Sequence, residues 1–274
     1  MSVDNTSERI QKILAQEGHG SRREIESWIA AGRISVNGKI AKLGDRISSQ
    51  DKVYFDGRML RLMKATTRKL RVIAYHKPAG EVCTRKDEKG RATVFDNLPR
   101  LSHGRWISIG RLDINTLGLL LFTNDGELAN RLMHPSTGID REYAVRVIGK
   151  VDMAILRQLQ KGVELEDGFA RFTDIVDSGG VGVNHWYHVV LMEGRHHEVK
   201  RLWESQGVKV SRLIRVRFGP VILPRRSRPG SIRELKKAEV DEIIQCSGME
   251  IEKIRRKITK KKNKSPLKTT KSGK

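Results

Sequence analysis

The chain has 274 residues and a formal net charge of +22 at pH 7, and its two cysteines lie far apart, which argues against a disulfide scaffold or a zinc ribbon. The N-terminal sequence MSVDNTSERI is polar and the longest apolar run, LGLLLF, is short, so we expect no signal peptide and no membrane span. A net charge this positive indicates a polyanionic partner, with nucleic acid as the first candidate. We expect the protein in the cytoplasm.

Residues 7–60 carry the signals of a small module built from two helices and short strands. The segment SERIQKILAQEG predicts a helix, and SRREIESWIAAGR predicts a second helix that begins with a capping box between Ser21 and Glu24. In the following ISVNGKIAK, the Asn-Gly pair favours a tight hairpin turn. We therefore expect a compact domain over residues 1–62, followed by a basic and polar linker at 63–69.

Arg22 and Arg23 lie in the first turn of the second predicted helix and point away from its apolar stripe. By themselves, two arginines are equally compatible with a solvated helix face and with a binding surface. The stretch SRREIESWIAAGRISVNG, however, resembles the signature SRREhxxxIxxGRhxVNG of the S4 RNA-binding domain. This resemblance implies that Arg22 and Arg23 contact an RNA backbone.

Residues 70–248 mix strands and helices in the pattern of a second, α+β domain. Strands are predicted at RVIAYHK, WISIG, LGLLLFT, REYAVRVIG, ARFTDIVD, HWYHVVLME and VSRLIRVRFG. Helices are predicted at GELANRLMHP, DMAILRQLQKG, RHHEVKRLWESQG and KKAEVDEIIQ. Because strands dominate and helices flank them irregularly, we expect a mixed, mostly antiparallel sheet flanked by helices. The basic residues of 249–274 predict a disordered tail that adds phosphate contacts.

The segment GRLDINTLGLLLFTNDG holds a carboxylate, Asp113, beside Arg111 and just ahead of an apolar run. The sequence DINT is ordinary turn chemistry, so Asp113 can be a turn cap, half of a structural ion pair or a catalytic group. A turn between two core strands holds its carboxylate rigidly at the edge of a sheet, which favours a functional role.

Two other segments offer candidate groups. Tyr143 opens the strand YAVRV and is either a core-edge residue or a ring that stacks on a base. In EGRHHEVKRLWES, helical spacing places Lys200 at the edge of the buried stripe, within reach of a pocket, and directs Arg201 toward phosphate or solvent. His196 and His197 are adjacent and cannot share a helix face as metal ligands would, so no metal site is predicted. The sequence has no Walker A or GxGxxG motif and no Ser-His-Asp pattern, so no nucleotide cofactor is predicted.

These segments together resemble the motifs of the pseudouridine synthases of the RsuA type. GRLDINTLGLLLFTNDG is similar to their GRLDxxTxGLLLLTNDG, while KPAGEVCT, REYAV and EGRHHEVKRL match three further motifs, with an S4 domain in front as in this group. The chain departs from many relatives at Glu198, where they have Gln, and at Lys200, where several have Arg. Lysine keeps the charge but loses the bidentate fork of arginine.

The resemblance implies that the protein isomerises uridine to pseudouridine without a cofactor. The N-glycosidic bond to C1′ breaks, the uracil turns, and C5 joins C1′. Asp113 would stabilise the charge on the sugar, as the nucleophile of retaining glycosidases does. Lys200 would keep Asp113 ionised and fixed, and Tyr143 would stack on the turned uracil and help to remove the C5 proton.

The resemblance also implies the RNA partner. The target uridine must be flipped out of its helix, and Arg111 would fill the vacated place or bind the flanking phosphate. Arg195 and Arg201, from the EGRHHEVKRL segment, are further expected RNA contacts. The overall similarity favours large-subunit (23S) ribosomal RNA or its precursor as the substrate. No large exposed apolar stripe demands a dimer, so we expect a monomer. The alternatives are an enzyme for small-subunit or transfer RNA, and a non-catalytic S4-type ribosome assembly factor.

Overall fold

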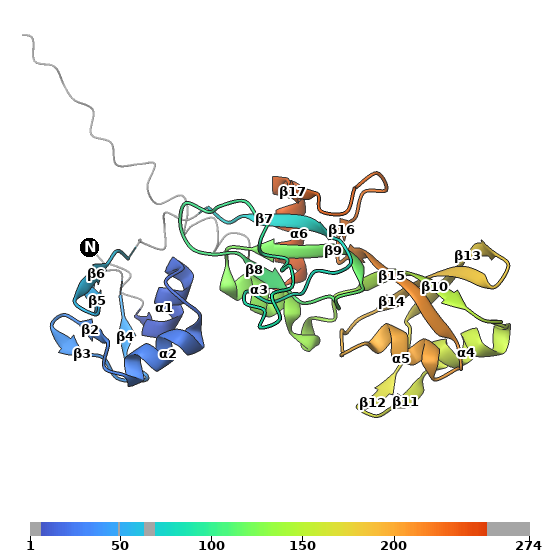
Figure 1. Cartoon of the computed structure of the whole chain (residues 1–274), viewed down its shortest axis with the longest axis horizontal. Helices are drawn as coiled ribbons and strands as arrows, with labels where there is room; N and C mark the ends of the chain where they lie inside the picture. The colour runs from blue at the N-terminus through green and yellow to red at the C-terminus, as the bar shows by residue number, and fades with distance from the viewer. Residues whose placement is uncertain (1–6, 49, 63–68, 251–274) are drawn as a thin grey trace, which may run out of the picture. The chain divides into compact units, whose positions relative to one another are not determined.

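The computed structural model describes residues 7–48, 50–62 and 69–250 (Figure 1). The chain forms two compact units that separate between Leu70 and Arg71, and residues 101–105 belong to the first unit rather than the second. Most of the predicted linker at 63–69 and of the predicted tail at 249–274 lies outside the described residues.

The first unit packs two helices and short strands around one small apolar core. Helix α1 (Ile10–Glu17) ends at a glycine in the left-handed conformation, and α2 (Arg22–Ala30) begins at the predicted capping box. The core joins one face of each helix, including Ile10 and Ile25, to the strands. Two sheets form: β1 (Glu8–Arg9) with β4 (Arg46–Ile47), and, in order, β3 (Lys39–Ile40), β2 (Ile34–Val36), β5 (Val53–Phe55) and β6 (Arg58–Leu60).

The second unit is built on a mixed sheet in the order β13-β14-β10-β15-β9-β7-β17, to which β16 adds by pairing with β15 and β8 by pairing with β9. Every pairing in this sheet is antiparallel except that of β15 with β9, which confirms the mostly antiparallel prediction. The strands are β7 (Val72–Lys77), β8 (Ile107–Ile109), β9 (Leu117–Thr123), β10 (Arg141–Ile148), β13 (Asp174–Val181), β14 (Asn184–Leu191), β15 (Lys209–Phe218), β16 (Val221–Ile222) and β17 (Ile232–Glu234).

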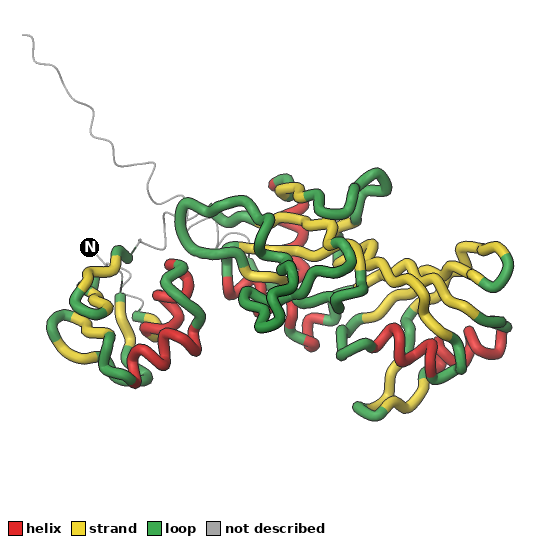
Figure 2. The backbone as a smooth tube through the Cα atoms, viewed as in Figure 1, coloured by secondary structure: helices red, strands yellow, loops and turns green. Residues whose placement is uncertain are grey.

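Helices and one separate hairpin surround this sheet (Figure 2). They are α3 (Gly126–Met133), the short 3-10 helix η2 (Pro135–Thr137), α4 (Met153–Lys161), α5 (Glu198–Glu204), α6 (Lys237–Cys246) and the hairpin of β11 (Val163–Leu165) and β12 (Gly168–Ala170). Asp125 caps α3 by accepting hydrogen bonds from the backbone N–H groups of Glu127 and Leu128. Among the described residues, no helix is long and apolar enough to cross a membrane.

Two predicted elements differ from the structure. The helix expected from Arg195 begins only at Glu198, because His197 has a φ of 52°, which lies in the left-handed region and cannot continue a helix. The segment ARFTDIVD is not one strand, since Ala170 ends β12 and Asp174 begins β13. The sequence did not indicate the β11–β12 hairpin that precedes this break.

The centre of the sheet fixes the segment that holds Asp113. Strand β9 is almost wholly buried, lies between β7 and β15, and pairs in parallel with β15 through Gly118 and Arg215. Gly118 has a φ of 105°, and a Cβ there would lie 2.3 Å from the backbone oxygen of Arg215, so only glycine permits this approach. The turn that contains Asp113 therefore leads directly into a buried strand in the interior of the sheet.

Candidate active site

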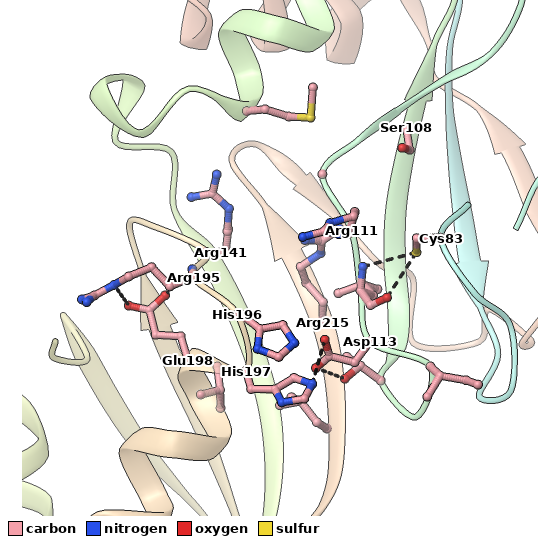
Figure 3. A pocket seen from close by; sticks show the side chains of 18 of the residues that line it. Cys83, Ser108, Arg111, Asp113, Arg141, Arg195, His196, His197, Glu198 and Arg215 are labelled. Atoms are coloured by element: carbon pink, nitrogen blue, oxygen red, sulfur yellow. Dashed lines mark hydrogen bonds and ion pairs between the residues drawn. The ribbon is translucent and has the colours of Figure 1, made fainter. Parts of the chain in front are cut away.

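An open pocket of about 1030 Å³ lies in the second unit, where β10, β15, the turn before β9 and the loop before α5 come together. Asp113, Tyr143, His197 and Arg215 all line it, and Figure 3 shows Asp113 facing the two histidines of the loop. The pocket thus contains two of the three predicted catalytic residues, and the third, Lys200, stands on α5 within ion-pair distance of Asp113.

Asp113 is at once a turn residue and a member of an ion pair. Its backbone oxygen accepts a hydrogen bond of 3.0 Å from the Thr116 N–H, and its Oδ2 accepts one of 3.4 Å from the Thr116 hydroxyl. Lys200 Nζ lies 3.8 Å from Oδ2, and His197 Nε2 lies 3.4 Å from Oδ1. The side chain keeps 28% of its exposure, so one carboxylate is held by several groups while remaining open to the pocket.

A buried lysine stabilises this turn through hydrogen bonds to its backbone. Lys77 is fully buried at the end of β7, and its ammonium donates to the carbonyl oxygens of Pro78, Ile114 and Thr116 at 2.9, 3.2 and 3.0 Å. Burial lowers the pKa of Lys77, while nearby negative groups, Asp113 among them, oppose that shift. This role was not predicted from the sequence, although a lysine that ends an apolar strand immediately before a proline was the available signal.

The KPAG segment supports the same turn at two more points. The Gly80 N–H donates to the Ile114 oxygen at 2.8 Å. Cys83 Sγ lies 3.2 Å from the Leu112 oxygen and 3.3 Å from its nitrogen, and burial raises the pKa of this thiol. The free cysteine is therefore packed against the chain that leads into the Asp113 turn.

Tyr143 forms a wall of the pocket. It is 7% exposed and lies opposite Arg215 on β15, at a register shift in the β10–β15 pairing. Cross-strand partners share one face of a sheet, so both side chains face the pocket. Arg215 is 2% exposed and donates from Nε to the Leu119 oxygen at 2.7 Å. Arg215 was not predicted as a site residue, and the alternation of VSRLIRVRFG gives no clear signal for it, because Arg215 shares its face with Ser211, Leu213 and Arg217.

Arg195 and Arg201 are held by carboxylates and carbonyls rather than directed outward. Arg201 makes a two-point ion pair with Asp167, at 2.8 Å for both bonds. Arg195 donates to Asp167, to the oxygens of Gly168 and Phe169, and to Glu193. Both arginines therefore attach α5 and its preceding loop to the β11–β12 hairpin. The expectation that Arg201 points to phosphate or solvent is wrong, because this hairpin covers its side of the helix.

Glu198, which stands where many relatives of the RsuA type have Gln, carries a buried carboxyl group. It is 3% exposed, and its Oε2 accepts a 2.9 Å hydrogen bond from the Arg195 N–H. Burial raises its pKa to about 7, an effect that the Arg195 N–H opposes and that Glu193 reinforces. The carboxyl group thus fixes the start of the loop that carries His196 and His197.

His196 and His197 come together in a way that the sequence analysis excluded. They precede α5 instead of lying on it, so the helix-face argument does not apply to them. Their rings stack with centroids 3.8 Å apart, and ligand atoms of both rings and of Asp113 lie within 4.8 Å of one another. Arg111, by contrast, lies where predicted, exposed beside Asp113 on the pocket.

Comparison with known proteins defines the class of protein to which this site belongs. Residues 71–205 match the RNA pseudouridylate synthase family and residues 8–53 match the S4 domain. A solved structure described as a pseudouridylate synthase superposes with a TM-score of 0.60 at 26% identity, covering 86% of this chain and 99% of its own. The chain belongs to the RNA pseudouridylate synthase family, with an S4 domain in front of the catalytic domain.

Its curated relatives include proteins named ribosomal large subunit pseudouridine synthase B. The Haemophilus influenzae protein is 58% identical over 247 residues, which cover 89% of this chain and 69% of the relative. The Pseudomonas aeruginosa protein is 58% identical over 243 residues, covering 88% and 63%. The Escherichia coli K12 protein is 56% identical over 262 residues, covering 92% and 90%. The chain therefore spans about two thirds of the first two relatives and nine tenths of the third.

Proposed function

We propose that this protein converts a uridine of large-subunit (23S) ribosomal RNA to pseudouridine. The observation that carries the proposal is the Asp113 carboxylate, which opens into the pocket with Lys200 Nζ 3.8 Å from one of its oxygens. The names of the relatives from Haemophilus influenzae and Escherichia coli, at 58% and 56% identity, support the same substrate.

Asp113 is the group that we assign to the glycosidic bond. As the bond from N1 of uracil to C1′ breaks, positive charge builds on the ribose, and an ionised carboxylate beside C1′ stabilises it. Lys200 holds that carboxylate ionised and in place. The reaction exchanges a C–N for a C–C bond within one nucleotide, with a proton lost from C5 and one gained at N1, so atoms and electrons balance without a co-reactant.

Tyr143 is the residue that we assign to the uracil. Its ring lies on the wall of the pocket, where it can stack on the detached base while the base turns. Its hydroxyl is then available to help remove the C5 proton. Uracil thus remains in the pocket between the two bond changes.

RNA contact is assigned to arginines that are exposed in the structure. Arg111 lies beside Asp113, and Arg22 and Arg23 lie on the first turn of α2. We propose that Arg111 occupies the place of the flipped uridine or binds its flanking phosphate, and that Arg22 and Arg23 bind the RNA backbone. We assign Arg195 and Arg201 the structural role of attaching the β11–β12 hairpin, and not an RNA contact. The protein acts as a monomer in the cytoplasm, where ribosomal RNA is found.

The test of substrate class uses the full-length protein and three unmodified transcripts: 23S ribosomal RNA, 16S ribosomal RNA and a transfer RNA mixture. Pseudouridine is detected by the reverse-transcription stop that appears after carbodiimide treatment. We expect a stop in the 23S transcript alone. A stop only in 16S or transfer RNA would contradict the specificity. Tight binding to 23S RNA without any stop would favour an assembly factor instead.

A further inference from the structure

We propose that Asp113, His196 and His197 form a binding site for a divalent transition metal ion, with Zn²⁺ as the best fit, and that the bound ion reversibly inhibits the enzyme. Metal binding follows from the geometry of the three side chains alone. The inhibition rests on the proposed function, because it requires Asp113 to act on the RNA.

The separation of the ligand atoms suits a small tetrahedral ion. One oxygen or nitrogen atom from each of the three side chains lies within 4.8 Å of the others, and His197 Nε2 is 3.4 Å from Asp113 Oδ1. Zn²⁺ binds imidazole nitrogen and carboxylate oxygen at about 2.0–2.1 Å, so two ligands of a tetrahedral ion lie roughly 3.4 Å apart. The His197–Asp113 pair already has that separation.

The backbone before α5 brings two consecutive histidines to one side. In a helix or a strand, neighbouring side chains diverge by about 100° or 180°. Here His197 has a φ of 52°, and the two imidazole rings stack instead of diverging. The loop is held at both ends, since the Arg195 N–H donates to Glu198 and the His197 oxygen accepts from the Arg201 N–H. The two rings therefore lie together beside Asp113, on a loop that is hydrogen-bonded at both ends.

The site is reachable from solvent through the pocket. Both histidines are exposed, and the His197 and Asp113 side chains keep 42% and 28% of their exposure. All three residues line the same pocket. A hydrated ion can thus reach the ligands without unfolding any element, and one or two coordination positions remain for water.

The two oxygens of Asp113 face different partners, which decides how an ion would bind. Oδ1 faces His197, whereas Oδ2 faces the Thr116 hydroxyl and Lys200. An ion on Oδ1 leaves Lys200 in place but withdraws the carboxylate from C1′ of the substrate. The nearby cations Lys200 and Arg111 oppose any metal, so binding depends on the imidazoles. That dependence selects Zn²⁺ over Mg²⁺, which prefers oxygen ligands and retains its waters.

The experiment measures binding and inhibition separately on the full-length protein. Binding is followed without RNA, by the visible absorption of added Co²⁺ and by its displacement with Zn²⁺. Three variants are compared. His196→Phe keeps the ring stack on His197 but removes a ligand, and His196→Cys keeps a ligand. His185→Phe is the matched control, because His185 also faces a carboxylate, Asp177, at 2.6 Å on another part of the domain.

We expect His196→Phe to weaken Zn²⁺ binding at least ~10-fold, since even changes in the groups behind a ligand cost about 10- to 100-fold. His196→Cys and His185→Phe should bind nearly as the wild type does. Inhibition by Zn²⁺, taken relative to the metal-free rate of each variant in excess Mg²⁺, should follow the same order and be relieved by more RNA.

Equal Zn²⁺ affinity in wild type and His196→Phe would overturn the site, as would an equal loss in His185→Phe. Zn²⁺ inhibition that is unchanged in His196→Phe would overturn the inhibitory role. If Co²⁺ binds as expected but no pseudouridine forms even without metal, the metal site stands and the proposed function fails.

Discussion

The buried carboxyl group of Glu198 makes a prediction about how stability varies with pH. Replacing it by Gln removes the ionisation but keeps an oxygen that can accept the hydrogen bond from the Arg195 N–H. In the wild type, the folded protein holds the Glu198 proton with a pKa of about 7, against an ordinary value of 4.5. Between pH 4.5 and 7, the folded state therefore binds more protons than the unfolded state, and stability falls as the pH rises.

The magnitude follows from the width of that window. A difference of about 2.5 pKa units at 1.36 kcal/mol per unit gives a loss of about 3 kcal/mol in the free energy of unfolding. This loss is absent below pH 4.5 and complete above pH 7. Glu198→Gln should therefore gain about 3 kcal/mol of unfolding free energy relative to wild type between pH 4.5 and pH 8. At acid pH, where both side chains are neutral, the two proteins should be nearly equal.

The assay is urea unfolding of both proteins at a series of pH values, followed by tryptophan fluorescence. Trp203 is fully buried on α5, the helix that begins with Glu198, and reports on this region. Parallel stability profiles for the two proteins across pH 4.5–8 would refute the reasoning. Such a result would mean that Glu198 titrates normally in the folded state, despite its burial.

Three further experiments test the groups around the site. Lys200→Met should slow single-turnover pseudouridine formation about 10- to 100-fold with little change in RNA affinity. The reason is that the Lys200–Asp113 pair, 3.8 Å apart, contributes at most about 4 kcal/mol before solvent reduces it. An equal loss of binding and rate would count against the ion-pair role. Lys77→Met should lower the unfolding free energy by about 1–3 kcal/mol, since three carbonyls lose their buried donor. Unchanged urea midpoints would show that the turn does not depend on the Lys77 ammonium. A double-mutant cycle of Arg201→Ala and Asp167→Ala should give a coupling free energy of about 0.5–1 kcal/mol in stability and none in RNA binding. A coupling in the RNA affinity would indicate that Arg201 contacts RNA after all.

The elements that the sequence predicted well are those with local signals. The capping box at Ser21 and the apolar run of β9 each depend on neighbours within a few residues. The position of Asp113 in a turn between two core strands follows from the same local pattern. The pairing of Asp113 with Lys200 came from the family resemblance and the helix spacing, and the 3.8 Å distance agrees with it.

The features that escaped prediction depend on contacts between distant segments or on one unusual backbone conformation. Lys77 reaches carbonyls of a turn nearly forty residues later, and Arg201 pairs with Asp167 of a hairpin that gave no sequence signal. The convergence of His196 and His197 depends on one left-handed residue, which helical periodicity cannot reveal. Helix spacing gives the direction of a side chain, but not what the rest of the chain places there.

The most direct test of the account compares Asp113→Asn with Asp125→Asn, a control in the same segment that keeps a good helix cap at the start of α3. Single-turnover pseudouridine formation and RNA affinity are measured for both proteins on 23S ribosomal RNA. We expect Asp113→Asn to bind RNA as the wild type does but to form no pseudouridine, while Asp125→Asn retains activity. Full activity of Asp113→Asn would contradict the central role of this carboxylate.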